Sequence, residues 1–402
     1  MRIGLISYYF PPESYASAAR AGPFAESWAE AKDTVHVFTH RLMQEEEGAI
    51  VEHEDIHVHR TRFGTVDNTH SLPVRFLFEL VFCLSVIGAV LRHRVDVLVS
   101  TSPPFLVAVT TLVLGRLTAT PYVVDIRDIY PEQLFAYDVV SRTSSFGRAL
   151  RWLERQVYDY ASLVVGVTEG LCSHIEKRAS TDVVLIRNGI DSRQFFRRES
   201  LSSGEEFVVI FHGTLGRSQN IELLLQYGQH LKRAEVSDVT LRVIGDGPEV
   251  ETLTRGIEEH QLSSYVEYCG HVDFDDIPTY LNQADVGFSP RLDGLINETA
   301  FPVKVYECLG CGLPVVVTPE SEVGRYVERH QVGFQHRNDD IEGIHESILR
   351  LKEDAQLYRE YSDRAVQVAG SFDRHTLGRR LRDEIAARLE GPSAFVSLES
   401  KV

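Results

Sequence analysis

The chain has 402 residues, of which 43% are hydrophobic and 25% are charged, and this ordinary globular composition excludes a disordered or collagen-like protein. The length predicts two or three domains of roughly 100–200 residues each. A formal net charge of −17, from 41 Lys and Arg against 58 Asp and Glu, argues against a nucleic-acid partner, because phosphate backbones bind basic faces.

Cysteine content and the N-terminus both bear on the compartment. Five cysteines form no disulfide framework, and the first residues enter a strand-like run without a signal peptide. We therefore expect a reducing, cytoplasmic location. The longest uncharged apolar run, residues 80–91, is shorter than the roughly 20 residues of a membrane span and predicts a buried helix. The alternative for residues 75–94, with arginines at both ends, is an anchor at the inner face of a membrane.

Short apolar runs alternate with longer amphipathic segments through the first half of the chain. The expected strands are residues 2–7, 35–39, 57–60, 95–100, 122–126, 163–167 and 183–186. The expected helices are residues 16–31, 74–93, 105–117, 146–160 and 171–178. Continuous Val, Ile and Leu runs indicate strands buried on both faces, which is typical of a parallel sheet covered by helices.

A turn-rich break at residues 187–191 and a charged, Ser- and Gly-rich linker at 197–206 precede a second series of the same kind. Strands are expected at residues 208–212, 240–244, 266–269, 286–289 and 315–318. Helices are expected at 220–231, 250–260, 278–284 and 304–309, with a helical region from 341 and a frayed tail at 391–402. The alternation predicts an α/β protein with two doubly wound domains of similar size.

Charged residues gather where one buried strand of the first half ends. Residues 125–132 contain Asp125, Arg127, Asp128 and Glu132, and open α/β sheets place ligands at the carboxyl ends of their strands. We favour a functional site there over a structural ion pair of Arg127 with a carboxylate. No G-x-G-x-x-G follows the first strand, which argues against an NAD enzyme.

The second half has three candidate ligand segments. Residues 213–217 combine Gly213 and Gly216 with Arg217 after a strand, which suits a diphosphate bound by backbone N–H groups and one cation. Gly245 lies in a turn whose simpler interpretation is a helix start. Lys304 and Glu307 lie three residues apart on one helix face, and ligand contact is at least as favoured there as a surface ion pair.

The histidines and cysteines predict no metal site. Cys308 and Cys311 have C-x-x-C spacing, but zinc needs four ligands, and the sequence contains neither a second C-x-x-C nor a matching His pair. We interpret both as small packing residues. The 16 histidines include no H-E-x-x-H motif.

A series of motifs in chain order resembles those of GT-B glycosyltransferases of the family-4 type, and the series extends over almost the whole chain. Residues 100–104 and 125–132 are similar to the subgroup that makes bacterial surface polysaccharides, the colanic-acid type. Residues 186–195 resemble the family's I-x-N-G-V-D-x-x-x-F, 243–248 its V-G-D-G-P, 266–290 its V-x-F-x-G-x-V … A-D-V … P, and 301–317 its P-x-K-x-x-E-x-x-A-x-G-x-P-V-V.

The resemblance implies two Rossmann-like domains facing a central cleft. Residues 1–188 would bind the acceptor, residues 189–371 would bind the nucleotide-sugar donor, and a helix at 372–390 would cross back to the first domain. It implies that Glu307 holds the donor ribose, and that Gly213, Arg217 and Lys304 lie at the diphosphate. The base would contact the backbone of Gly270, His271 and Val272, and Gly245 belongs to a donor-side motif.

The resemblance also implies catalytic candidates: Asp128 near the reacting sugar, and Arg127 in a slot that is His in many relatives. The family's E-x7-E pair would begin at residue 299, but this chain has Thr299, with Glu298 one residue earlier. Either an E-x8-E loop delivers Glu298 to the sugar in its place, or the role is lost. The usual pair of cations after the second domain's first strand is reduced to Arg217, and Lys304 is the candidate replacement.

The implied function is that of a retaining hexosyl- or N-acetylhexosaminyltransferase in bacterial surface polysaccharide biosynthesis. It would move a sugar from a nucleoside-diphosphate sugar, expected to be a UDP-sugar, to a glycan or polyprenyl-linked acceptor. No cofactor or obligatory metal is expected, and no nucleic acid. The alternatives are a GT-B nucleotide-sugar epimerase and a non-catalytic glycosyltransferase-like partner subunit.

Overall fold

The computed structural model describes residues 1–13, 15, 17–42, 53–62, 72–136, 139–198 and 206–390. Its contacts divide the chain into unit 1, Met1–Asn188 with the segment from Arg374, and unit 2, Gly189–Asp373. Residues 199–205 of the expected linker and the expected tail at 391–402 lie outside the described residues.

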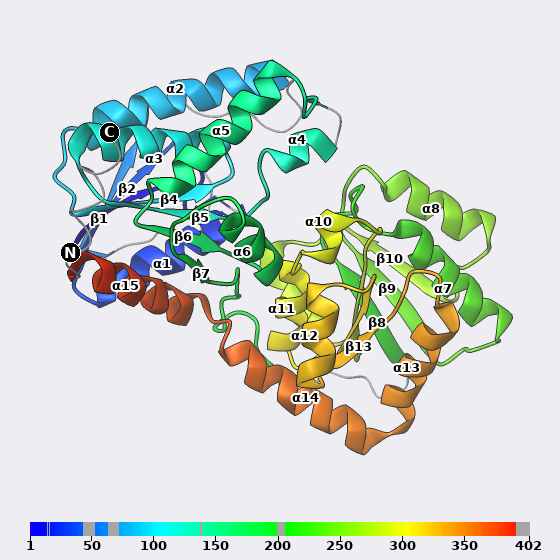
Figure 1. The fold of residues 1–402 in the computed structure, drawn as a ribbon. Helices are drawn as coiled ribbons and strands as arrows, with labels where there is room; N and C mark the ends of the chain where they lie inside the picture. Colours follow the sequence, from blue (N-terminus) through cyan, green and yellow to red (C-terminus); the bar gives the residue numbers. More distant parts are fainter. Residues whose placement is uncertain are drawn as a thin grey trace. The chain divides into compact units, whose positions relative to one another are not determined.

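Unit 1 is built on a parallel sheet with the strand order β3-β2-β1-β4-β5-β6-β7 (Figure 1). The sheet confirms the parallel pairing that the apolar runs predict. Its strands are β1 (Arg2–Ile6), β2 (Thr34–Thr39), β3 (Ile56–Arg60), β4 (Val97–Ser102), β5 (Tyr122–Ile126), β6 (Leu163–Gly166) and β7 (Val183–Leu185).

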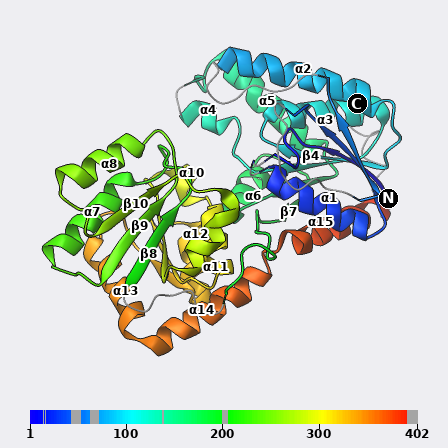
Figure 2. The same ribbon diagram turned by 180° about the vertical axis from the view of Figure 1, so that it is seen from behind.

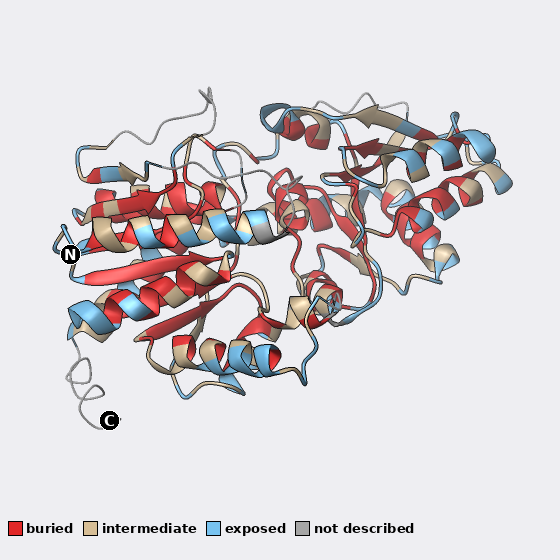
Figure 3. Ribbon diagram, turned by 90° about the horizontal axis from the view of Figure 1, so that it is seen from above, coloured by how far each residue is buried: buried red, intermediate tan, exposed pale blue. Residues whose placement is uncertain are grey.

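Helices cover both faces of this sheet because successive side chains of a strand point to opposite sides. They are α1 (Ala18–Glu30), α2 (Leu72–Val90), α3 (Phe105–Thr118), α4 (Glu132–Ala136), α5 (Ser145–Asp159), α6 (Glu169–Glu176) and α15 (Arg374–Glu390). Ile6 of β1 packs in a core with α2, α3 and α5, whereas its neighbour Leu5 packs in a second core with α1 and α15. Figure 3 shows the strands buried and the outer helix surfaces exposed.

The last described helix, α15, belongs to unit 1 although the chain reaches it after unit 2. It lies beside α1 (Figures 1 and 2). The indole Nε1 of the fully buried Trp28 donates a hydrogen bond to the Gly378 carbonyl at 2.8 Å, and Arg382 Nε lies 2.7 Å from Asp33 Oδ2. The C-terminal helix therefore returns to the N-terminal domain, as the family resemblance implied.

Unit 2 repeats the architecture with a parallel sheet in the order β10-β9-β8-β11-β12-β13. Its strands are β8 (Phe207–His212), β9 (Val239–Ile244), β10 (Val266–Gly270), β11 (Val286–Pro290), β12 (Val315–Thr318) and β13 (Gly333–Gln335). Its helices are α7 (Ile221–Arg233), α8 (Val250–Glu259), α9 (Ile277–Asn282), α10 (Leu295–Glu298), α11 (Val303–Gly310), α12 (Glu322–His330), α13 (Ile341–Glu353) and α14 (Ala355–Gly370), with a 3₁₀ turn at Phe274–Asp276.

The predicted α/β fold is confirmed, and the sequence patterns missed mainly short or polar elements. The three-residue β13 has too few residues to show a period. The helix α12 is mostly polar, with the sequence EVGRYVERH. The single helical region predicted from residue 341 is three helices, α13 to α15. None of the helices in the described part of the chain has both the length and the apolar character needed to span a membrane.

Candidate functional site in the carboxyl-edge loops

Three glycine loops meet at the carboxyl edge of the unit 2 sheet. Gly213, Gly245 and Gly270 end or follow the neighbouring strands β8, β9 and β10, and each has a positive φ. The Gly213 N–H donates to the Ile244 carbonyl at 3.0 Å, and the Gly245 N–H donates to the Gly270 carbonyl at 2.8 Å. Parallel strands place their carboxyl ends side by side, so glycines far apart in the sequence form one continuous edge.

These glycines have different physical roles. A Cβ on Gly245, whose φ is +142°, would lie 1.9 Å from the Gly213 carbonyl oxygen, so Gly245 allows the two loops to approach each other. Gly270 has φ +74°, and a Cβ there would meet no described atom within 4 Å. The loop surface at Gly270 is therefore open to a ligand, whereas Gly245 faces its neighbouring loop.

The other predicted donor residues near this edge differ in exposure. Arg217 lies exposed in the loop after β8. The His271 side chain is exposed, with its Nε2 3.9 Å from Asp273 Oδ1, while Val272 packs partly against the hydrophobic core. The backbone from Gly270 to Val272 therefore forms a surface ledge next to the glycine loops.

Helix α11 brings Glu307 to the end of β8. Glu307 is buried, and its Oε2 is 2.8 Å from Nε2 of the buried His212, the last residue of β8. Sequence reasoning missed His212, although its place directly before the glycine loop was a usable signal. The hydrogen bond fixes one carboxylate oxygen of Glu307. Among the described residues no other side chain bonds this carboxylate, so its second oxygen can accept from a ligand.

Lys304 lies one helical turn before Glu307, on the same face of α11. Its Nζ is 3.3 Å from Gln219 Oε1 and 3.8 Å from the centre of the Phe211 ring. A Cβ placed on Gly213 would lie 3.7 Å from this Nζ, so the ammonium group adjoins the glycine loop. Gln219 is a second residue that the motifs did not indicate.

Burial, with a smaller contribution from the nearby Arg291 guanidinium, lowers the pKa of Lys304 to about 7 against the opposing effect of Glu307. An anion bound beside Lys304 would favour the charged form of its side chain and so raise this pKa. Perturbed lysines of this kind are enriched at functional sites.

Glu298 lies in a different environment from Glu307. It is the last residue of α10 and lines a hollow of about 720 Å³ together with Thr299, and neither Lys304 nor Glu307 is among the described residues that line it. The hollow is strongly charged, and its lining is Asp293, Glu298, Thr299, Pro319, Glu320, Arg325, Arg337, Asn338 and Asp339.

In unit 1 a buried ion pair lies at the carboxyl end of β5, just before Arg127 and Asp128. Arg20 of α1 donates two hydrogen bonds of 2.9 Å to the Asp125 carboxylate and another to the Ile186 carbonyl. Asp125 is therefore paired with Arg20, and Arg127 lies close enough to Asp125 and Asp128 for both carboxylates to act on it electrostatically. Sequence reasoning missed Arg20, although a lone arginine on the apolar α1 was a signal.

Arg127 and Asp128 follow β5 directly. Within the described part of the chain, the buried Arg127 Nε has no hydrogen-bond partner. Burial lowers the pKa of Arg127, and Arg20 lowers it further, while Asp125 and Asp128 oppose the shift. The Asp128 carbonyl accepts a hydrogen bond from the Tyr130 N–H at 2.9 Å. A guanidinium with an unused buried donor beside a carboxylate can recognise a hydroxyl-rich or anionic ligand.

Cys308 and Cys311 are free, buried thiols in the hydrophobic core of unit 2, as predicted. Burial raises the pKa of Cys311 to about 12, with a smaller contribution from Glu307. A protonated thiol is neither a good nucleophile nor a metal ligand, so packing is the role that the structure supports.

Comparison with known proteins gives matches in both units. Residues 16–189 match the family model described as a glycosyl transferase 4-like domain, and residues 192–368 match that of glycosyl transferases group 1. Among curated relatives, the putative colanic acid biosynthesis glycosyltransferase WcaL of Salmonella typhimurium is 24% identical over 205 residues, which are 50% of each chain.

A second relative, the N-acetyl-alpha-D-glucosaminyl L-malate synthase of Bacillus anthracis, is 22% identical over 223 residues, or 52% of this chain and 54% of that protein. The chain thus spans about half the length of these curated relatives. Among solved structures, Anabaena HepE in complex with UDP has a TM-score of 0.70 at 18% identity, covering 96% of this chain and all of that one.

WaaG, a glycosyltransferase involved in lipopolysaccharide biosynthesis, has a TM-score of 0.67 at 16% identity, covering 95% of this chain and 99% of that one. At these identities the structural matches establish the fold, and they agree with two Rossmann-like units.

Proposed function

This chain belongs to the GT-B glycosyltransferases of the family-4 type, and from that premise we propose that it transfers a sugar from a nucleoside-diphosphate sugar to an acceptor in surface polysaccharide biosynthesis. The observation that supports this proposal most strongly is that the glycine loops, Lys304 and the His212–Glu307 pair lie together at the carboxyl edge of the unit 2 sheet. We assign the donor to this unit and the acceptor to unit 1.

We propose a UDP-sugar as the donor. HepE, whose fold this chain shares, was solved with UDP and with UDP-glucose. In our proposal the free oxygen of Glu307 accepts from a ribose hydroxyl, and Lys304 contacts the diphosphate beside the Gly213 loop. Arg217 reaches the same phosphates, and the ledge from Gly270 to Val272 holds the base through its backbone.

In this proposal the protein lowers the barrier to sugar transfer chiefly by electrostatic stabilisation. Negative charge builds on the leaving diphosphate as the glycosidic bond breaks, and oriented N–H groups with a cation stabilise that charge. In this proposal the cations Lys304 and Arg217 do so without an obligatory metal. Transfer retains the anomeric configuration by attack from the face that the diphosphate leaves. Asp128 orients the acceptor hydroxyl, Arg127 stabilises charge near the reacting sugar, and Glu298 contacts the donor sugar.

The test is a panel of UDP-, GDP- and dTDP-linked hexoses and N-acetylhexosamines, each incubated with and without a polyprenyl-diphosphate-sugar acceptor. We expect one nucleotide to be released only when the acceptor is present, together with a glycosylated lipid product. Release that ignores the acceptor, an isomerised donor, or no binding of any nucleotide would each contradict the proposal.

Unit 1 also presents a surface suited to a lipid-linked acceptor. Exposed apolar residues lie on α2 (Phe76, Leu77 and Leu84) and on α5 (Phe146 and Trp152), and α3 packs against both helices (Figure 1). Arg148 and Arg151, also exposed, donate to the carbonyls of Thr143 and Arg142. Apolar side chains beside cations suit an anionic bilayer, so we propose that unit 1 docks on the inner face of the membrane.

Changing Phe146 and Trp152 together to Ser is expected to weaken binding to liposomes of anionic phospholipid about tenfold, since the bilayer interface covers part of each ring at about 25 cal/mol per Å². Flotation of the full chain measures this. The matched control changes Phe196 and Phe274, exposed aromatic residues of unit 2, to Ser. Equal losses in both double variants would contradict the proposed docking face.

Lys304 makes donor binding depend on pH. Its pKa of about 7 in the free protein must rise when the diphosphate binds, so binding takes up a proton. The Kd for a UDP-sugar should therefore increase from pH 7 to pH 9, by at most about tenfold per pH unit. Calorimetry in buffers of different ionisation enthalpy measures the proton uptake. Lys304→Met should bind weakly with no such dependence, and a flat profile in the unmodified protein would refute the contact.

A further inference from the structure

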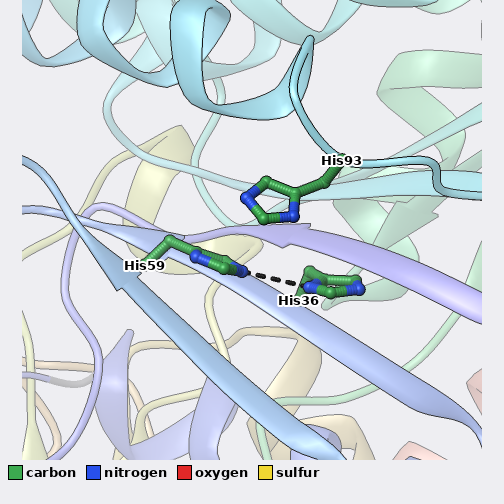
Figure 4. A group of neighbouring side chains, drawn as sticks. All are labelled: His36, His59 and His93. Atoms are coloured by element: carbon green, nitrogen blue, oxygen red, sulfur yellow. Dashed lines mark hydrogen bonds between the residues drawn. The ribbon is translucent and has the colours of Figure 1, made fainter.

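Three histidines from separate elements of unit 1 bring their ring nitrogens together (Figure 4). His36 lies on β2, His59 on β3, and His93 in the turn between α2 and β4. One ring nitrogen of each lies within 4.8 Å of those of the other two, and His36 Nδ1 is 3.0 Å from His59 Nε2. None of the proposed donor or acceptor contacts uses these residues.

The parallel register of β2 and β3 explains the arrangement. His36 is opposite His57, and Phe38 is opposite His59, so all four residues share one face of the sheet. The fully buried Phe38 ring stacks on His59 at 5.0 Å and lies 5.9 Å from the His93 ring. The Phe38 ring therefore packs against two of the three imidazoles.

The electrostatics favour neutral imidazole, which is the ligating form. Burial, with smaller contributions from neighbouring histidines, lowers the pKa of His59 to about 4. The same causes also lower the pKa of His36. The positions of the nitrogens, and not these shifts, carry the inference that follows.

We propose that His36, His59 and His93 form a binding site for a divalent transition-metal ion of the zinc type, with a fourth position for water. Imidazole nitrogens are preferred ligands of this metal class. Tetrahedral zinc with bonds of 2.0–2.1 Å requires nitrogens about 3.3–3.4 Å apart. The His36–His59 separation of 3.0 Å is already near this value. The ring nitrogen of His93 lies within 4.8 Å of the other two, and its ring centre is 4.1 Å from that of His59, so metal binding requires the His93 side chain to turn toward the shared position.

The bound ion would join β2, β3 and the turn after α2, and would therefore stabilise unit 1 without taking part in transfer. A hydrogen bond between two neutral imidazoles also explains the His36–His59 distance, but it gives no reason for the third ring nitrogen. The sequence motifs predict no metal site because the three histidines lie in different elements, far apart in the sequence, and so form no local spacing motif.

The experiment titrates Zn²⁺ into full-length protein freed of metal by chelation, and follows binding by calorimetry and unfolding by tryptophan fluorescence. Both tryptophans, Trp28 and Trp152, lie in unit 1, so fluorescence reports on the unit that holds the site. We expect one tight Zn²⁺ per chain and a higher Tm. Co²⁺ should give the visible absorption of a tetrahedral site.

The variants make the assignment specific. His93→Ala should weaken Zn²⁺ binding at least tenfold and abolish the Tm increase, since even outer-shell partners of zinc ligands contribute about 10–100-fold. His93 lies in a turn, so this variant is expected to fold. His57→Ala is the matched control, because His57 is on the same strand face outside the trio, and it should bind as the unmodified protein does. Several weak sites per chain, or equal binding by His93→Ala, would overturn the proposal.

Discussion

Replacing Glu307 with Gln is expected to lower kcat/KM for the donor by roughly 10–100-fold, because a hydrogen bond to a charged group contributes about 1.5–3 kcal/mol. Gln keeps the size of the side chain and an oxygen that can accept from His212 Nε2, now 2.8 Å from Glu307. The loss would therefore come from the negative charge offered to the donor ribose. Initial rates with the donor identified by the panel, and calorimetry with UDP, measure it.

His212 provides the comparison for this prediction. His212→Gln leaves the Glu307 charge in place but removes the ring that fixes it, so we expect a smaller loss, mainly in KM. Folding of both variants is checked by calorimetric unfolding, because the two tryptophans lie in unit 1 and do not report on unit 2. Unchanged turnover in a correctly folded Glu307→Gln variant would remove Glu307 from the proposed site.

The sequence predicts the strands of this fold better than its smaller elements, for a physical reason. A strand buried on both faces is mostly apolar, so β12 is visible as a run of three Val residues and β5 as Tyr122–Val124, although β5 also carries the buried Asp125. Helix α12 buries only Glu322, Val323, Gly324 and Val327, and so shows little apolar pattern. The break at Asn188 was visible because turn residues occur where one unit ends.

In the candidate site too, residues whose contacts are close in sequence were easier to predict than residues whose partners are far away in sequence. Lys304 and Glu307 could be predicted because their spacing places them on one helix face. His212, Gln219 and Arg20 could not be predicted in the same way, because their partners are 95, 85 and 105 residues away in sequence. Glycine motifs reveal that a loop is tight, but only the fold shows that Gly245 faces Gly213 while Gly270 faces outward.

The Arg20–Asp125 pair is expected to have the largest effect on stability. Both side chains are buried, at 2% and 4% exposed, and Asp125→Ala would leave the Arg20 guanidinium without its counter-ion. Removing one partner of a buried ion pair costs about 3–5 kcal/mol of unfolding free energy. Urea unfolding followed by tryptophan fluorescence measures this for unit 1, since Trp28 is fully buried there.

The double variant separates the ion pair from the rest of the packing. Arg20→Met with Asp125→Leu removes both charges, so its destabilisation should be smaller than the sum of those of the single variants Arg20→Met and Asp125→Leu, and the difference is the coupling between the side chains. Arg20 also donates to the Ile186 carbonyl, so the double variant should still be less stable than the unmodified protein. Additive losses, or a cost below 1 kcal/mol for Asp125→Ala, would show that this pair does not hold α1 and the β7 end against β5.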